Sequence, residues 1–132
     1  MYSILLACVI SGYFWIYPLK ISNGWDATPA HWAYFKVLRE MEQKISVSGI
    51  DPGSVGSFFP IKGNTEFKDL REKGTIIPEA DPATDEYILF SNVCNAGDEV
   101  IDELNDESRW SPAITVKKGK VLMILYKRVA GT

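Results

Sequence analysis

Hydrophobic positions follow two different patterns along the chain. Residues 1–19 carry no charged side chain, are apolar on all sides, and end in an aromatic cluster between Tyr13 and Tyr17. A helix of about 20 apolar residues spans the hydrocarbon core of a bilayer, and Trp and Tyr are enriched where such a helix meets the headgroups. The pattern therefore predicts a transmembrane helix over residues 1–19, a connector over 20–28, and a small α/β domain over 29–132.

Other interpretations of the apolar segment fit its flanks less well. A cleaved signal peptide has basic residues before its apolar core and small residues at its cleavage site, and neither is present here. A core helix of a small domain is usually apolar on one side only. The missing basic flank favours a chain that is the C-terminal part of a longer multi-pass protein, in which Met1 is not the natural start. The nearby basic residues Lys20, Lys36 and Arg39 would place the domain in the cytoplasm by a simple count, but long domains translocate largely regardless of such charges.

Amphipathic spacing predicts one long helix after the connector. Thr28 is a suitable N-cap, Pro29 suits the first helical position, and Gly49 suits the left-handed residue after the last turn. The apolar residues recur every three or four positions, which places them on one inner face. They are Trp32, Phe35, Leu38, Met41 and Ile45. The predicted helix covers residues 29–47.

Short apolar runs after this helix predict the strands of a sheet. Ser54–Phe59 and Tyr87–Val93 have strand length, and the second is apolar enough to be covered on both faces. A short helix over 67–73 and a second helix ending at Leu104 are expected between and after them. Residues 113–116 and 121–126 bracket a Gly-containing turn and predict a hairpin. The order of elements predicts an α/β fold with a mainly parallel, helix-flanked sheet, parallel neighbours at 54–59 and 87–93, and a C-terminal β-hairpin.

Composition excludes several classes of function. The net charge is −3 and the isoelectric point is about 5.1, whereas a nucleic-acid-binding domain would have a basic face, so no nucleic-acid partner is expected. The tight group Lys117, Lys118 and Lys120 flanks a turn glycine and is interpreted as a solvated turn. Neither a phosphate-binding glycine motif nor a Cys/His metal spacing occurs, and His31 has no second ligand near it. We therefore expect no cofactor and no metal site.

Candidate chemistry is confined to one pair of residues and one acidic run. Trp25 and Asp26 follow the predicted membrane helix closely, where a carboxylate could meet an acceptor or another part of the protein. The alternative is that Asp26 only favours the start of the following helix through the helix dipole. The acidic residues at positions 98–107 are interpreted as a solvated helix face. Ser91 follows an apolar strand but lacks the flanking glycines of a nucleophile elbow.

Several segments together resemble a known family. They are Tyr17-Pro18, Gly24-Trp25-Asp26-Ala27-Thr28, Phe58-Phe59-Pro60, Tyr87-Ile88-Leu89-Phe90-Ser91-Asn92 and the run from Val121 to Arg128. They resemble the C-terminal end of bacterial multi-pass glycosyltransferases of the GT-C type, the dolichyl-phosphate-mannose mannosyltransferase-like group. The resemblance covers nearly the whole chain, through loose patterns rather than an invariant signature.

The resemblance implies a function that this chain supports without performing it. It implies sugar transfer from a polyprenyl-phosphate donor, with the catalytic Asp or Glu upstream of Met1, so the expectation is a non-catalytic extracytoplasmic domain with no catalytic residue of its own. The implied partners are membrane lipid and the upstream transmembrane domain of the same protein, and Trp25 and Asp26 are the candidate contact. Two alternatives remain open: a membrane-anchored interaction or sensing domain without enzymatic role, and a soluble cytoplasmic domain whose first segment belongs to its core.

Overall fold

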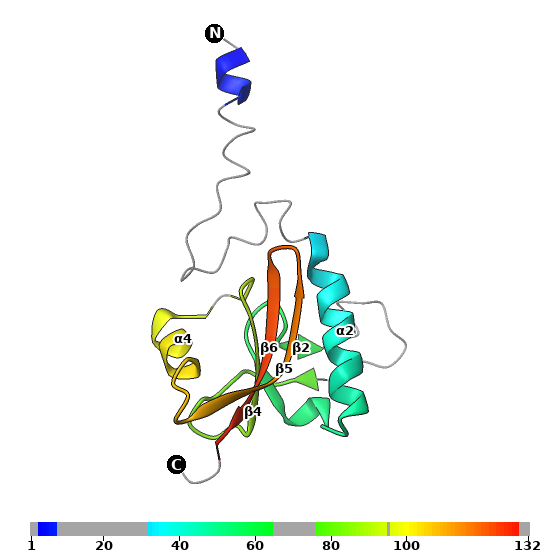
Figure 1. Ribbon diagram of the computed structural model, residues 1–132, viewed down its shortest axis with the longest axis vertical. Helices are drawn as coiled ribbons and strands as arrows, with labels where there is room; N and C mark the ends of the chain where they lie inside the picture. Colours follow the sequence, from blue (N-terminus) through cyan, green and yellow to red (C-terminus); the bar gives the residue numbers. More distant parts are fainter. Residues whose placement is uncertain (1–2, 8–31, 65–75, 95, 130–132) are drawn as a thin grey trace.

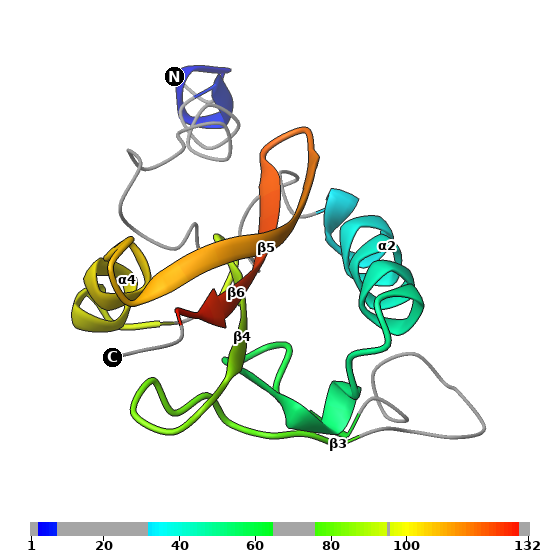
Figure 2. The same ribbon diagram turned by 60° about the horizontal axis from the view of Figure 1, so that its bottom comes forward.

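The computed structural model describes residues 3–7, 32–64, 76–94 and 96–129. In these ranges the elements are α2 (Tyr34–Val47), the 3-10 helix η2 (Pro52–Ser54), β1 (Val55–Ser57), β2 (Gly63–Asn64), β3 (Ile76–Ile77), β4 (Tyr87–Ser91), α4 (Asp98–Leu104), β5 (Trp110–Lys118) and β6 (Val121–Arg128). Figures 1 and 2 show α2 and α4 on opposite sides of the main sheet.

The predicted long helix is present as α2. A 3-10 turn at residues 32–33 leads into it, and residues 28–31, including the predicted cap and His31, lie outside the described residues. At its other end, Gly49 has a φ of 71°, and its N–H donates to the Ser46 carbonyl oxygen at 3.1 Å. Glycine adopts this left-handed conformation without the steric cost that a Cβ imposes, so the helix ends where the sequence predicts.

The inner face of α2 differs from the predicted one. Its buried residues are Tyr34, Val37, Met41 and Ile45. Of the five predicted inner residues only Met41 and Ile45 are buried, and Leu38 is half-buried. Trp32 and Phe35 are 75% and 53% exposed. Both candidate faces have helical spacing, so the periodicity could not decide between them, and packing against the sheet selects the face that contains Tyr34 and Val37.

The main sheet has the strand order β1-β4-β6-β5. Strands β1 and β4 are parallel, with Ser57 opposite Leu89, which confirms the prediction that 54–59 and 87–93 are parallel neighbours. The pairs β4–β6 and β6–β5 are antiparallel. The predicted mainly parallel sheet is therefore wrong: the C-terminal hairpin pairs through β6 with the centre of the sheet and makes two of its three strand pairs antiparallel.

The predicted transmembrane helix is also wrong for the observed fold. Residues 3–7 are helical. Among the residues that the structure describes, no helix is both long and apolar enough to cross a membrane. The remainder of the 1–19 segment, and the connector over 20–28, lie outside those residues.

The core forms where α2 covers one face of the sheet. Along β6, Val121, Met123 and Leu125 are at most 1% exposed, whereas Leu122 and Ile124 between them are half-buried. This alternation is the period of two expected for a strand whose faces differ in cover. Strand β4 is buried on both faces, as its apolar run predicts, because Ile88 and Leu89 point to opposite sides and are 0% and 1% exposed.

Two further predicted elements are present, whereas the two-stranded sheet of β2 and β3 was not predicted. Strands β5 and β6 form the predicted hairpin, and Gly119 in its turn has a φ of 60°. Helix α4 ends at Leu104, as the sequence predicts, and Leu104 is its buried residue. The predicted helix over 67–73 lies outside the described residues.

Candidate functional site

The candidate contact formed by Trp25 and Asp26 lies outside the described residues. Its role therefore stays a prediction. The chemistry that the structure does describe is found in three places: the segments that carry the family resemblance, a loop held by Arg128, and the acidic helix α4.

Two of the segments quoted for the predicted resemblance pair in the sheet, where they form β4 and β6. Strand β1 runs into Phe58-Phe59-Pro60, where the Phe59–Pro60 peptide bond is cis. Strand β4 pairs with β1 on one side and with β6 on the other. Segments that are far apart in the sequence thus form the centre of the fold.

Two buried serines, one in β1 and one in β4, donate hydrogen bonds to main-chain groups. Ser57, which is 0% exposed, donates from Oγ to the carbonyl oxygen of Leu89 at 2.7 Å. Ser91, also 0% exposed, donates from Oγ to the carbonyl oxygen of Leu122 at 2.8 Å. Because each hydroxyl proton is committed to a carbonyl oxygen, neither serine is arranged beside a general base as a nucleophile would be.

Asn92 ties the end of β4 to the start of β6. Its Nδ2 donates to the carbonyl oxygen of Lys120 at 2.7 Å, and its Oδ1 accepts from the Leu122 N–H at 2.9 Å. The amide satisfies two main-chain groups of the neighbouring strand and so fixes the hairpin against β4. This residue stabilises the sheet.

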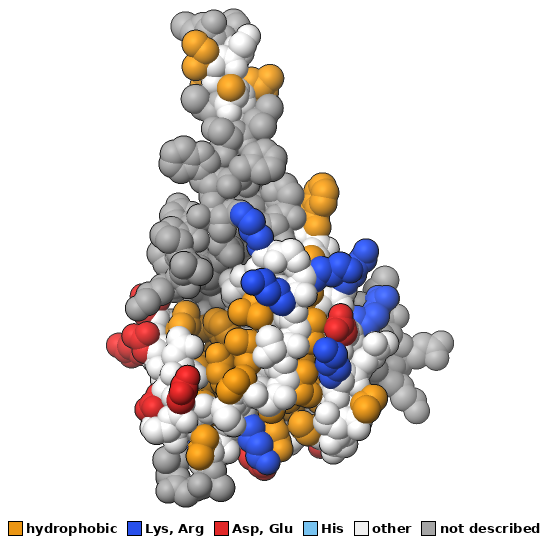
Figure 3. All heavy atoms as spheres, viewed as in Figure 1, with side chains coloured by type: hydrophobic (Ala, Val, Ile, Leu, Met, Phe, Trp, Pro, Cys, Tyr) orange, Lys and Arg blue, Asp and Glu red, His pale blue; other side chains and the backbone are white. Residues whose placement is uncertain are grey.

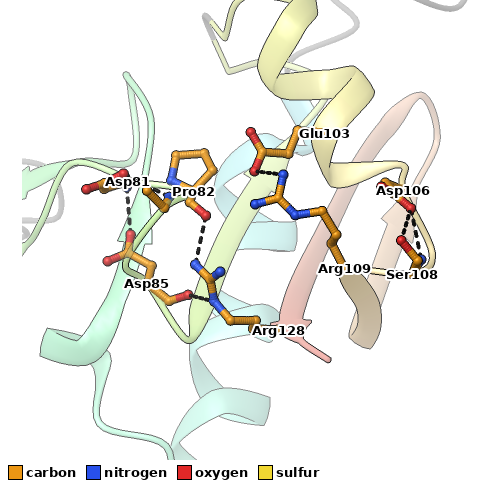
Figure 4. Close-up of polar contacts among 9 residues, drawn as sticks. Asp81, Pro82, Asp85, Glu103, Asp106, Ser108, Arg109 and Arg128 are labelled. Carbon is orange, nitrogen blue, oxygen red and sulfur yellow. Dashed lines mark hydrogen bonds and ion pairs between the residues drawn. The ribbon is translucent and has the colours of Figure 1, made fainter. Parts of the chain in front are cut away.

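Arg128, at the end of β6, makes the most extensive set of described side-chain contacts with the loop before β4 (Figure 4). Its Nε donates to the Asp85 carbonyl oxygen at 2.9 Å, and its Nη2 donates to the Pro82 carbonyl oxygen at 2.7 Å. Its guanidinium carbon lies 4.9 Å from the centre of the Trp110 ring, which is a cation–π contact. The fixed geometry of the guanidinium lets one side chain bind two carbonyls and cover a buried indole.

The same loop is closed by its own carboxylates. Asp81 accepts from the Ala83 N–H and from the Thr84 hydroxyl, both at 2.9 Å. These hydrogen bonds favour the ionised form and lower the pKa of Asp81. Asp85 accepts from the Asp81 N–H at 2.8 Å. The two carboxylates thus stabilise the conformation of the loop through hydrogen bonds within it.

Helix α4 and the turn after it carry most of the acidic run. Glu103 pairs with Arg109 at 2.8 Å (Figure 4), whereas Asp98 and Glu99 are exposed in the first turn, where the helix dipole favours them. Asp106 accepts from the Ser108 hydroxyl and N–H, which lower its pKa. Among the described residues, no group of three or more His, Cys, Asp or Glu is arranged to hold a metal ion.

The sequence did not lead us to predict the contacts that Arg128 makes with the loop before β4, or the exposure of Trp32 and Phe35. Arg128 and Asp85 are 43 positions apart, and no local pattern links them. For the aromatic pair the signal was present, since Tyr34 and Val37 offer a second inner face with the same helical spacing.

The described polar groups in and around the sheet thus form hydrogen bonds within the fold, and the predicted contact lies outside the described ranges. The residues that carry the family resemblance include the sheet centre described above. No family model, no curated protein and no solved structure matches this chain.

Proposed function

We propose that this chain is a non-catalytic domain of a membrane glycosyltransferase, one that transfers a sugar from a polyprenyl-phosphate donor. The domain lies outside the cytoplasm, supports the transfer and leaves the chemistry to another part of the same protein. The resemblance described above motivates the proposal. The observation that supports it is that two of these segments, which form β4 and β6, pair inside the sheet, and that Ser91 and Asn92 there bind main-chain groups of the neighbouring strand.

That observation supports a structural role for the resembling residues. A catalytic group must reach its substrate and must be free to move a proton or form a bond. Ser91 is fully buried and donates to a carbonyl oxygen instead. Buried residues of this kind specify a fold, and a domain whose described polar side chains serve its fold suits an accessory role.

Trp25 and Asp26 are the residues that we propose meet the acceptor or the upstream membrane domain. A carboxylate can accept hydrogen bonds from sugar hydroxyls, and an indole can stack on a sugar ring. The competing explanation gives Asp26 only a role in starting α2.

The test is sugar transfer in membranes that carry the intact gene with Trp25→Ala or Asp26→Asn. We expect each variant to lower transfer at least tenfold, about 1.4 kcal/mol, while protein abundance and the thermal midpoint stay at the wild-type level. The matched control is Glu99→Gln, which also removes one carboxylate and is exposed in α4. Glu99 is preferable to Glu103, whose carboxylate pairs with Arg109. An Asp26→Asn protein that transfers sugar normally but melts earlier would contradict the proposed contact.

A second candidate is an interaction domain without enzymatic role. Phe90, Leu122 and Ile124 are half-buried on the face of the sheet that does not meet α2. Figure 3 shows hydrophobic side chains gathered between α4 and the β5–β6 hairpin. If removing residues 29–132 from the intact gene leaves sugar transfer unchanged, this candidate replaces the first.

A further inference from the structure

The start of α2 exposes two large aromatic side chains. Trp32 is 75% exposed and Phe35 is 53% exposed, although neighbouring Tyr34 and Val37 are buried at 3% and 1%. Single exposed apolar residues are common, but exposed aromatic residues that lie together mark contact surfaces. The two aromatics lie on the side of the helix that faces away from the sheet.

Basic side chains accompany the two aromatics on α2. Lys36 follows Trp32 by four positions and Arg39 follows Phe35 by four, so all four residues fall on one side of the helix. Both basic side chains are exposed. This side of the helix thus carries aromatic and cationic residues together, and both residue types occur in helices that bind at a membrane interface.

The hairpin turn adds three lysines to the same end of the domain. Figures 1 and 2 both place the turn between β5 and β6 beside the N-terminal end of α2. Lys117, Lys118 and Lys120 are all exposed there. Figure 3 shows basic side chains over the hairpin turn and over α2. We call this surface the basic end, and it consists of Trp32, Phe35, Lys36, Arg39, Lys117, Lys118 and Lys120.

The cations of the basic end make no ion pair with any carboxylate that the structure describes. Within the described residues, none of its five cations forms an ion pair, whereas Lys44 pairs with Glu40 at 3.2 Å and Lys127 pairs with Glu86 at 3.8 Å. The acidic residues of α4 lie across the sheet from α2 (Figure 2). Figure 3 shows acidic side chains gathered over α4, and also acidic atoms between the basic side chains of α2. A chain with a net charge of −3 thus presents a localised positive surface.

We propose that the basic end docks on an anionic phospholipid surface. Each Lys or Arg near such a surface strengthens binding roughly fivefold, and Trp and Phe enter the headgroup region. A hairpin turn and a helix end that lie side by side suit a flat membrane. This inference takes one point from the proposed function, namely that the chain is located at a membrane. Its test contains no sugar donor, so the two proposals can fail separately.

The test is sedimentation of the full 132-residue chain with vesicles of phosphatidylcholine alone or with 30% phosphatidylglycerol. The wild-type chain should bind the anionic vesicles at least tenfold more tightly, and 0.5 M salt should remove most of the difference. Lys117→Gln, Lys118→Gln and Lys120→Gln together should weaken binding to anionic vesicles on the order of 100-fold. Every variant keeps residues 1–19, so any binding by that apolar stretch cancels in the comparison.

A matched triple variant separates position from total charge. Lys44→Gln, Lys62→Gln and Lys127→Gln also remove three lysines, but at positions outside the basic end, and should change binding less than threefold. Trp32→Ala with Phe35→Ala should weaken binding on the order of tenfold, against no change for Val47→Ala with Ile76→Ala, which are exposed elsewhere. Circular dichroism checks that each variant is folded. Equal binding to both vesicle types, equal loss in the two lysine triples, or no vesicle binding at all would overturn the proposal in favour of another partner.

Discussion

Gly56 lies in β1 where the loop before β4 approaches the strand closely. A Cβ at this position would lie 2.8 Å from the Ala80 Cα and would collide with the Asp85 carboxylate. The Ala80 N–H donates to the Ser57 carbonyl oxygen at 2.9 Å, which holds the loop in this place. The absence of a side chain at Gly56 therefore permits the contact between the loop and the strand.

Gly56→Ala should destabilise the domain because the clash involves main-chain atoms that cannot rotate away. Overpacking of this kind costs about 1–3 kcal/mol in the free energy of unfolding, measured by urea denaturation. Gly53→Ala is the matched control, since the closest atoms to a Cβ there belong to the Asp51 carboxylate, at an ordinary contact distance of 3.5 Å. Equal stability of the two variants would show that the loop moves aside without cost.

The carboxylate of Asp81 predicts a pH dependence of stability. Its hydrogen bonds to Ala83 and Thr84 lower its pKa in the folded state, so the ionised form stabilises the fold above the ordinary aspartate pKa of about 4. This contribution is lost as the pH falls through the lowered pKa. Asp81→Asn should therefore melt earlier than the wild type at pH 7, and the gap should narrow below about pH 4. Glu107→Gln, at an exposed position, should follow the wild-type pH profile. A constant gap for Asp81→Asn would remove the electrostatic explanation.

At the scale of the elements, β4 is the interior strand that joins β1 to the C-terminal hairpin. It pairs with β1 on one edge and β6 on the other, and both of its faces are buried. Its apolar run is the reason that the sequence predicts a doubly covered strand.

Leu89→Ala should lower the free energy of unfolding by roughly 2–5 kcal/mol, because Leu89 is 1% exposed and its loss leaves a cavity. Chemical denaturation measures the change. Ile76→Ala in β3, where the side chain is 69% exposed, should stay within about 0.5 kcal/mol of wild type. A near-neutral Leu89→Ala would contradict the central place of β4.

Local patterns predicted the elements better than their arrangement. The helix ending at Gly49, the doubly buried β4 and the hairpin around Gly119 each follow from nearby residues, and the structure confirms them. The strand order does not follow from nearby residues. Alternating strands and helices suggested a parallel sheet, but β6 inserts between β4 and β5, a long-range pairing that no local periodicity encodes.

The candidate site was less predictable than the fold. Trp25 and Asp26 were chosen from their distance to an expected membrane helix, and they lie outside the described residues. The amphipathic period of α2 allowed two inner faces, and the wrong choice hid the exposure of Trp32 and Phe35. The lysines of the hairpin turn, taken alone, indicated only a solvated turn. Their position beside α2 depends on tertiary packing.

At the scale of the whole molecule, the domain has a structural centre and an asymmetric surface. Strands β4 and β6 form the centre of the main sheet. Acidic residues lie over α4, and the basic end lies beside the start of α2. A domain of this kind is suited to support a reaction that another part of the protein carries out. This supporting role is the central proposal.

Sugar transfer from a labelled polyprenyl-phosphate sugar tests that proposal most directly. The reactions contain the purified chain alone, membranes that hold the rest of the protein without residues 29–132, or both together. The account predicts no transfer by the chain alone and faster transfer by the membranes when the domain is restored. Transfer by the chain alone, or transfer by the membranes that is indifferent to the domain, would contradict it.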